Sequence, residues 1–213
     1  MMNNSIQSRR ERERQAHAAE IVAAAEKVFG RKGFDEASVD EIAKEAQFTR
    51  RTVYQYFVTK EDLYFAVITK GFRTLDSYFD ESRAIPGNGY QKIQRAGWVY
   101  YRFYQDFPDI FRLMNYIGYI RKRAAGSSEL AEFLKVDDQL FRELTAVIRE
   151  GQADGSIRGD LDAERAGYSL VFVLTGFFYQ LAAAGRNFAT HRALDEADFV
   201  RATLELICQG FRA

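Results

Sequence analysis

The chain contains only two prolines in 213 residues, and this scarcity constrains the fold more than any other feature of the sequence. Proline interrupts a helix because it lacks the backbone N–H and its ring clashes with the preceding turn. Ala, Leu, Glu, Arg and Gln, which lose little side-chain freedom in a helix, are abundant. The sequence therefore predicts an all-α fold, and 47% hydrophobic content supplies a sizeable core.

Few residues could hold a metal ion or carry out catalysis. Cys208 is the single cysteine, and His17 and His191 are the two histidines, far apart in the sequence. We expect no disulfide, no metal site and no cofactor, and the absence of a motif for a nucleophile or an acid–base pair argues against an enzyme. The polar N-terminus does not resemble a secretory signal, so we expect a cytoplasmic protein.

The formal net charge is zero, so a site for a polyanion must be local. The run from 166 to 185 has no charged residue and is nearly long enough to cross a bilayer. Its polar and glycine residues, and the lack of a second such run, favour instead a helix that packs into its own core on one side and into a partner subunit on the other. We therefore expect no membrane span.

Hydrophobic spacing and capping residues predict the helices. Apolar residues recur every three or four positions over 17–31, and a stop is expected near Gly33. Ser38 with Glu41 forms a capping-box pattern, Thr49 can cap the next helix, and Thr59 with Asp62 can begin a long helix that ends near Ser82. Further helices are expected over 90–106, 128–151, 162–184 and 195–211, with short helical segments up to Ile120.

The short helix after Thr49 carries an unusual number of hydrogen-bonding side chains. When Val53 is placed at the centre of the buried face, Phe57 lies beside it, whereas Arg51, Thr52, Tyr54 and Gln55 point outward. Two short helices joined by a tight turn, with such an outward face on the second, are typical of insertion into the DNA major groove. A solvated polar face is the alternative interpretation.

Residues 21–63 resemble the DNA-binding domain of the TetR family of bacterial transcriptional repressors. The matching residues are Ile21, Ala24, Ala25 and Phe29, KGF at 32–34, ASV at 37–39, IA at 42–43, TVYQYF at 52–57 and TKEDL at 59–63. The resemblance implies a flexible arm at 1–16, a helix-turn-helix domain at 17–63 and an effector-binding, dimerising domain at 64–213. It implies phosphate contacts from Ser38, Thr49, Tyr54 and Lys60, and base or groove contacts from Arg50, Arg51, Thr52, Gln55 and Tyr56.

Two positions depart from the family pattern. Gln47 and Arg51 stand where the family usually has glycine. A side chain at Gln47 would cost about 1 kcal/mol if the turn requires a positive φ. The arginines at 9–14 could reach phosphates or a minor groove, but they alternate with glutamates, and a solvated tail explains them equally well.

The remaining helices suggest an effector cavity and a dimer interface. Several tyrosines lie on one apolar arc of 90–106, which suits an aromatic cavity, although ordinary core packing stays open. The predicted cavity residues are Tyr100, Phe103, Tyr104, Phe111 and Phe172. The predicted interface residues, on the last two helices, are Gly176, Ala183, Phe199, Val200, Thr203, Ile207 and Phe211.

These features predict a transcriptional regulator. The family resemblance implies a homodimeric repressor released from a near-palindromic duplex operator by a small hydrophobic or aromatic effector. A helical protein-interaction module without DNA binding is the first alternative and an enzyme the second. Specific binding to duplex DNA would exclude the interaction module.

Overall fold

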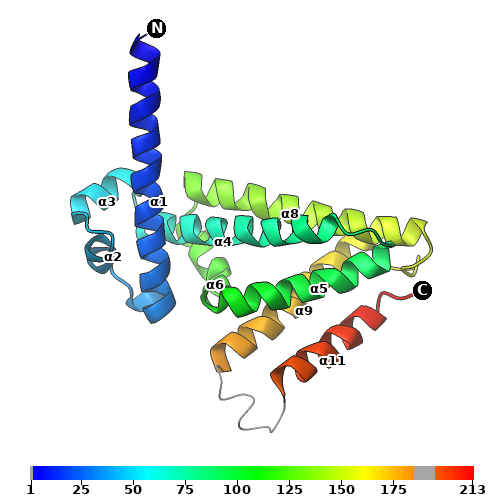
Figure 1. Cartoon of the computed structure of the whole chain (residues 1–213). Helices are drawn as coiled ribbons and strands as arrows, with labels where there is room; N and C mark the ends of the chain where they lie inside the picture. Colours follow the sequence, from blue (N-terminus) through cyan, green and yellow to red (C-terminus); the bar gives the residue numbers. More distant parts are fainter. Residues whose placement is uncertain (1, 185–194) are drawn as a thin grey trace. The chain divides into compact units, whose positions relative to one another are not determined.

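The structure is a computed structural model that describes residues 2–184 and 195–213, with side chains from residue 9 onward, and this part of the chain is helical with no β-strand (Figure 1). The predicted all-α class is confirmed. The helices are α1 (Met2–Glu36), α2 (Val39–Glu45), α3 (Arg50–Tyr56), α4 (Lys60–Arg83), α5 (Gly89–Asp106), α6 (Pro108–Met114), α7 (Ile117–Arg123), α8 (Ser128–Ala153), α9 (Ala163–Ala184) and α11 (Glu196–Gln209).

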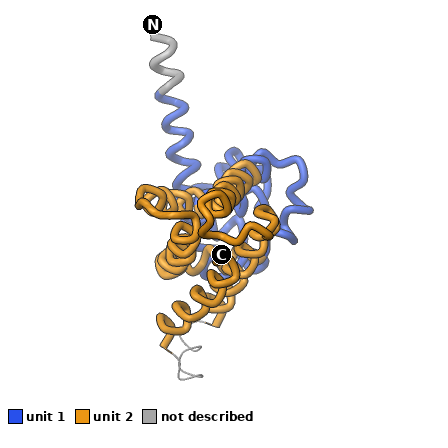
Figure 2. The backbone as a smooth tube through the Cα atoms, turned by 90° about the vertical axis from the view of Figure 1, so that its right-hand side faces the viewer, with its two compact units in different colours: residues 1–70, 116–133 blue, residues 71–115, 134–213 orange. Residues whose placement is uncertain are grey.

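The chain forms two compact units. Unit 1 comprises residues 1–70 and 116–133, and unit 2 comprises residues 71–115 and 134–213 (Figure 2). Both α4 and α8 therefore contribute residues to each unit. The division into an arm, a DNA-binding domain and an effector domain at residues 16 and 63 stays a prediction, and these units divide the chain differently.

The predicted capping residues are found at the helix starts. Ser38 accepts from the Glu41 amide while the Glu41 carboxylate accepts from the Ser38 amide, which makes the expected capping box of α2. At α4 the Thr59 amide donates to Asp62 at 2.9 Å and the Asp62 amide donates to the Thr59 hydroxyl at 3.1 Å. These short-range contacts fix the starts of α2 and α4, the helices that precede and follow α3 in the chain.

The first helix is longer than the sequence predicted. The expected helix covered 17–31, whereas α1 begins at Met2 and runs to Glu36, with a break at the expected stop, Gly33, where φ is 76°. Pairs one turn apart explain the extension: Arg9 lies 2.9 Å from Glu13, and Gln15 donates to Glu11 at 3.2 Å. Residues with high helix propensity, joined by such pairs, continue a helix that the apolar pattern does not mark.

The core of unit 1 combines apolar side chains of the first four helices with residues from later in the chain. Ile21, Phe29, Ile42 and Val53 are buried, and Phe34 lies edge-on to Tyr64 at 5.4 Å between ring centroids. Rings from the second stretch complete this core, since Phe34 contacts Tyr116 at 6.4 Å and Phe65 contacts Phe133 at 5.5 Å. The segment 116–133 is thus a structural part of the unit that holds α3.

In unit 2, α5 packs against α6, α9 and α11. At the start of α5 a Cβ on Gly89 would lie 2.2 Å from the Gly151 Cα, so only glycine allows this approach to α8. The Gly89 amide donates to Asp154 at 2.9 Å, which fixes the same contact. In the same unit, aromatic residues of α5 contact those of α6 and α9.

Candidate nucleic-acid interface

The α3 helix has the two faces that its sequence predicted. Val53 is fully buried, whereas Arg51 and Gln55 are exposed and the Tyr54 side chain is 39% exposed. Arg51 and Gln55 have no hydrogen bond or ion pair with any residue that the structure describes. An unpaired arginine and an unpaired amide on one helix are free to bind base edges or phosphates.

The start of α3 is held by its own threonines. Thr49 caps the helix by accepting from the Thr52 amide at 3.1 Å, and the two hydroxyls lie 2.8 Å apart. Both side chains remain near the surface. Each hydroxyl keeps at least one further hydrogen-bonding position, so a phosphate contact by Thr49 and a groove contact by Thr52 stay predictions compatible with this geometry.

Arg50 is held away from the free part of the α3 surface. Its guanidinium lies 2.8 Å from Asp40 of α2 and 5.5 Å from the centre of the Tyr54 ring. Arg50 and Asp40 are both exposed, so water screens the pair and its net stabilisation is small. A phosphate or a base can therefore compete with Asp40 for Arg50.

Ser38 uses its hydroxyl within the protein. The hydroxyl lies 3.0 Å from a Glu41 oxygen, and Lys32 donates to the other oxygen of the same carboxylate. Hydrogen bonding from Lys32, followed by that from Ser38, lowers the pKa of Glu41 to about 2. Direct binding of a phosphate by Ser38 would have to share this hydroxyl with the capping box.

Lys60, for which a phosphate contact was predicted, is engaged with backbone carbonyl groups. Its half-buried side chain donates to the carbonyls of Phe34 at 2.9 Å and Ala37 at 3.0 Å, and the ammonium lies 4.3 Å from the centre of the Phe34 ring. Asp35 O is a third, longer acceptor at 3.4 Å. Lys60 therefore joins the start of α4 to the end of α1, a long-range contact that the sequence pattern did not indicate.

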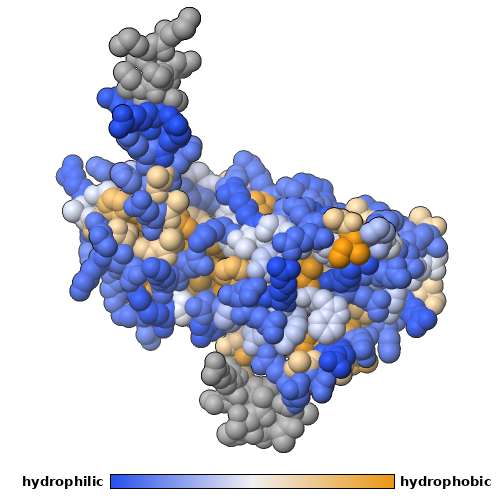
Figure 3. All heavy atoms as spheres, in the orientation of Figure 1, coloured by the Kyte–Doolittle hydropathy of each residue, from blue (hydrophilic) through white to orange (hydrophobic). Residues whose placement is uncertain are grey.

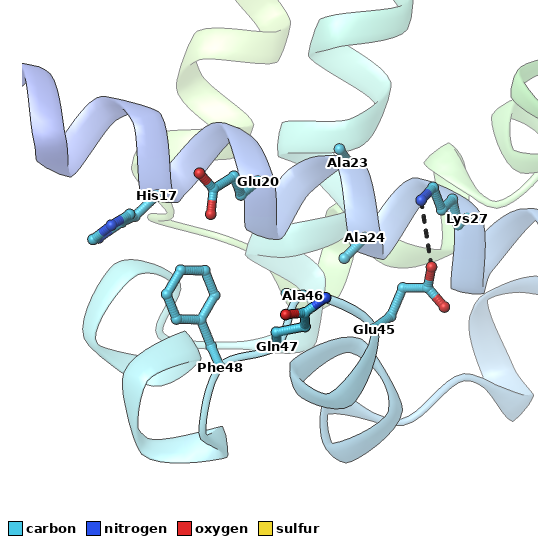
Figure 4. Close-up of a pocket in the computed structure, with 9 residues that line it drawn as sticks. All are labelled: His17, Glu20, Ala23, Ala24, Lys27, Glu45, Ala46, Gln47 and Phe48. Atoms are coloured by element: carbon cyan, nitrogen blue, oxygen red, sulfur yellow. Dashed lines mark ion pairs between the residues drawn. The ribbon is translucent and has the colours of Figure 1, made fainter.

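The turn before α3 rests on α1. Phe48 packs edge-on against His17, with 5.2 Å between ring centroids (Figure 4). On the same ring, His17 Nδ1 lies 3.2 Å from the Tyr56 hydroxyl. Tyr56 is thus half-buried, and its hydroxyl already has a partner. Sequence reasoning gave His17 no role, because nothing local indicates that it meets residues 31 and 39 positions away.

The backbone at Gln47 has φ of 58°, the left-handed conformation considered for this turn. Its side chain is exposed beside the Lys27–Glu45 ion pair, whose atoms lie 3.4 Å apart (Figure 4). A non-glycine residue in this conformation is strained. The turn keeps its shape because contacts on both sides of Gln47 hold it.

Four of the five predicted effector residues lie together in unit 2. Tyr100, Phe103 and Tyr104 of α5 are buried with Phe111 of α6, and Phe178 of α9, which the sequence did not single out, joins them. Phe178 lies 5.5 Å from Tyr104 and 5.6 Å from Phe111 between centroids. Burial raises the pKa of Tyr100 to about 12, so its hydroxyl stays protonated and can donate a hydrogen bond.

Phe172 is placed away from this cluster. Its side chain is 77% exposed on the outer face of α9, so its assignment to the cavity does not agree with the structure. The helix is apolar on most of its circumference, and the wheel alone could not distinguish the side toward the core from the side toward solvent. Phe178, on the inner side, occupies the place that Phe172 was expected to take.

The predicted interface residues divide into exposed and buried groups. Gly176 and Ala183 are exposed on α9, and Phe199, Thr203 and Ile207 are partly exposed on α11. Val200 and Phe211 are buried within the chain itself, so they are not available to a partner, contrary to the prediction. Tyr168, Phe172, Val173 and Leu206 are exposed apolar residues on the same two helices that the interface prediction did not include.

One helix in the described part of the chain, α9, is long and apolar enough to cross a membrane by length and composition. Its inner side, which includes Leu170, Leu174 and Phe178, is buried in unit 2. The core helix of a globular unit passes the same test of length and composition. The feature to explain is thus the outer apolar side of α9.

Comparison with known proteins places the chain in a class. Residues 21–67 match the family model described as bacterial regulatory proteins, tetR family. The chain is 26% identical over 161 residues to the transcriptional repressor NicS of Pseudomonas putida, covering 74% of this chain and 73% of that protein. It is 32% identical over 91 residues to the regulator EthR of Mycolicibacterium smegmatis, a match that spans only 42% of each chain.

Solved structures share the whole architecture. The ketosteroid regulator KstR2 of Mycobacterium tuberculosis superposes with a TM-score of 0.69 at 15% identity, covering 92% of this chain and 95% of that one. The regulator FadR of Bacillus subtilis, solved with stearoyl-CoA, gives 0.68 at 16% identity, covering 91% and 99%. At these identities the likeness shows the fold.

The family match of residues 21–67 and the similarity to the regulators NicS and EthR identify a helix-turn-helix DNA-binding regulator rather than an enzyme. Residues 21–67 belong to the TetR family of bacterial regulatory proteins, and the curated relatives that match this chain are transcriptional regulators. Sequence reasoning had identified this family from the pattern around α2 and α3, and that identification is confirmed.

Proposed function

We propose that the chain is a homodimeric repressor that binds a near-palindromic operator and is released from it by a small, mainly hydrophobic effector. The observation that carries the DNA-binding half is the α3 surface, where Arg51 and Gln55 are exposed without partners. A surface of this kind on a capped helix can contact both phosphates and base edges. A cytoplasmic location follows from the DNA target.

Dimerisation rests on the outer face of α9. Tyr168, Phe172 and Val173 are exposed there, and Gly176 beside them presents no side chain. Leu206 of α11 is 71% exposed as well. Two helices from each protomer, packed through such faces, would form a four-helix bundle in which the small residues allow close approach.

Symmetry then determines the form of the operator. In a two-fold dimer the two α3 helices enter successive major grooves only if they lie about 34 Å apart. The two half-sites must therefore be inverted repeats separated by one helical turn. An effector that changes this separation lowers the affinity for the operator.

The aromatic cluster supports the apolar character of the effector. Phe111 and Phe178 surround Tyr100, whose hydroxyl would be the polar group that orients a ligand. The structural neighbours KstR2, named for ketosteroids, and FadR, solved with stearoyl-CoA, are associated with largely apolar molecules. We assign the effector to the same broad class, hydrophobic or aromatic.

Selection of bound sequences from a random duplex library tests the DNA-binding half directly. We expect enrichment of an inverted repeat with half-sites one helical turn apart. The selected duplex should bind the dimer at least 1,000-fold more tightly than a scrambled duplex at physiological salt, in the range of specific DNA-binding proteins. Failure to enrich any sequence would favour the alternative of a helical protein-interaction module.

The effector half is tested by titrating hydrophobic and aromatic compounds into the complex with the selected duplex. A releasing compound should lose its effect when Tyr100 is replaced by Phe, if the Tyr100 hydroxyl orients it. Affinity of the Tyr100→Phe protein for the duplex alone should stay unchanged, which serves as the internal control. Release that is equally strong in this variant would contradict the placement of the effector beside Tyr100.

A further inference from the structure

The N-terminal part of α1 is a helix whose side chains from residue 9 to residue 17 are all exposed. Figure 1 shows it projecting beyond α2 and α3, and Figure 3 shows a hydrophilic surface where the projecting part is coloured by hydropathy. A helix that buries no apolar face gains nothing from packing, and local charge pairs add only about 0.2–0.5 kcal/mol each. This segment therefore gains most from a partner outside the protein.

The contacts of His17 define which side of this helix faces α3. His17 packs against Phe48 and lies within hydrogen-bond distance of Tyr56. The face of α1 that carries His17 therefore faces α3. Residues three and seven positions earlier lie on the same face of a helix. These residues are Arg14 and Arg10.

The carboxylates of the segment are engaged elsewhere. Glu13 pairs with Arg9 at 2.9 Å, and Glu11 accepts from Gln15 at 3.2 Å. Among the residues whose side chains the structure describes, Arg10 and Arg14 have no acidic partner. The charges of the alternating Arg and Glu residues largely cancel in the sequence. On the helix, however, two guanidinium groups without an acidic partner lie on the face toward α3.

We propose that Arg10 and Arg14 bind DNA phosphates beside the major groove that α3 reads, so that α1 extends the footprint on each half-site. The proposal rests on the DNA binding proposed above. Arg10 and Arg14 are four residues apart, about 6 Å along a helix, which corresponds to about two nucleotides at 3.4 Å each. Two unpaired guanidinium groups on one face are complementary to this row of phosphates.

The helical form of the segment decides between two kinds of contact. An extended basic arm can enter a minor groove, but an α-helix with side chains is about 10–12 Å wide and the minor groove of B-DNA is about 6 Å wide. Helical residues 9–16 must therefore stay on the sugar–phosphate backbone. The contacts add affinity and fix orientation but read no sequence.

The test compares two double variants that remove the same charge from opposite faces. The Arg10→Ala, Arg14→Ala variant lacks the two arginines on the face that carries His17. The Arg9→Ala, Arg12→Ala variant is the matched control. Alanine has the highest helix propensity, so α1 keeps its helix in both, which circular dichroism verifies. Each protein is titrated at several salt concentrations against the selected operator with long flanks and against a duplex trimmed to the bases that α3 covers.

On the long duplex we expect the Arg10/Arg14 variant to lose at least tenfold in affinity. Its log–log salt slope should fall by about 1.8 per protomer, at about 0.9 for each phosphate contact. The control should lose much less, and on the trimmed duplex the Arg10/Arg14 variant should bind like the wild type. Hydroxyl-radical footprints should shorten at the outer edges only in the Arg10/Arg14 variant.

Equal losses in the two double variants would overturn the assignment of this face. If the Arg10/Arg14 variant matches the wild type on the long duplex, the extension of the footprint is wrong, while specific binding to the trimmed operator leaves the proposed function intact. If the wild type itself does not distinguish operator from scrambled DNA, the proposed function fails, and this inference fails with it.

Discussion

The outer faces of α3 and α9 are both exposed, but they differ in the consequence of that exposure. On α3 the exposed side chains include Arg51 and Gln55, which water hydrates well when DNA is absent. On α9 the exposed side chains include Phe172 and Val173, at 77% and 50% exposure, for which water is an unfavourable neighbour. The outer face of α3 therefore suits reversible binding, and the outer face of α9 suits a permanent interface.

The largest effect is expected from a charge placed on the outer face of α9. Phe172→Asp would bury an unpaired carboxylate in the dimer and should weaken association by several kcal/mol. Sedimentation velocity at micromolar concentration should then show a monomer, and operator affinity should fall because one half-site is lost. Phe172→Leu, which keeps an apolar side chain, is the matched control and should remain a dimer. A dimer that tolerates Phe172→Asp unchanged would exclude this face as the interface.

Two substitutions on the outer face of α3 distinguish a contact with a base from a contact with a phosphate. Gln55→Ala should reduce affinity for the selected operator by roughly 1–3 kcal/mol and leave scrambled DNA unaffected, because a base contact carries sequence information. Tyr54→Phe should weaken both duplexes about equally, by roughly 0.5–1.5 kcal/mol, because it removes a phosphate hydrogen bond. Binding titrations with both duplexes separate the two. Identical losses on operator and scrambled DNA for Gln55→Ala would contradict base reading.

A substitution at Lys60 tests whether this residue stabilises the fold or binds a DNA phosphate. If its ammonium binds the carbonyls of Phe34 and Ala37 in the complex as well, Lys60→Met should lower the free energy of unfolding by about 1–2 kcal/mol and leave the salt slope of DNA binding unchanged. If it binds a phosphate instead, the slope should fall by about 0.9 per protomer. Urea unfolding and salt titrations of one variant distinguish the two roles.

The smallest expected effect concerns acid stability near α3. The pKa of Glu41 is about 2 in the folded protein, held down first by the Lys32 ammonium and then by Ser38, against an ordinary value of 4.5. A lowered folded-state pKa stabilises the protein above about pH 4.5, and this stabilisation is lost as the pH falls toward 2. Glu41→Gln should flatten the stability curve in that window. Thermal unfolding between pH 2 and 6 measures it, and an unchanged acid slope would contradict the assignment.

What the sequence predicted correctly is mainly short-range. The caps Ser38, Thr49 and Thr59 were predictable because each accepts from an amide three residues away. The exposed face of α3 followed from its position relative to Val53 on a helical wheel. Both depend on residues close together in the chain, so no knowledge of the fold was needed.

The remaining features depend on distant contacts. The carbonyl partners of Lys60 lie 23 to 26 residues earlier, and Tyr56 meets His17 across 39 positions. Phe172 and Phe178 are equally apolar in the sequence, and only the packing of α9 on α5 and α6 separates the exposed ring from the buried one. Hydrophobicity indicates that burial of a side chain is favourable, but it does not show which residues bury it.

The rings of Tyr116 and Phe133, which complete the core around Phe34 and Phe65, affect how the protein is made and how it can be recombined. During synthesis the N-terminal helices leave the ribosome well before these rings do, so the unit that holds α3 gains its last packing contacts only after residue 133 has emerged. A chimaera joined at Lys70 would combine the first 70 residues with a foreign substitute for Tyr116 and Phe133. Exchange of DNA specificity between such regulators should therefore transfer the α3 surface alone, or carry the segment 116–133 along with residues 1–70.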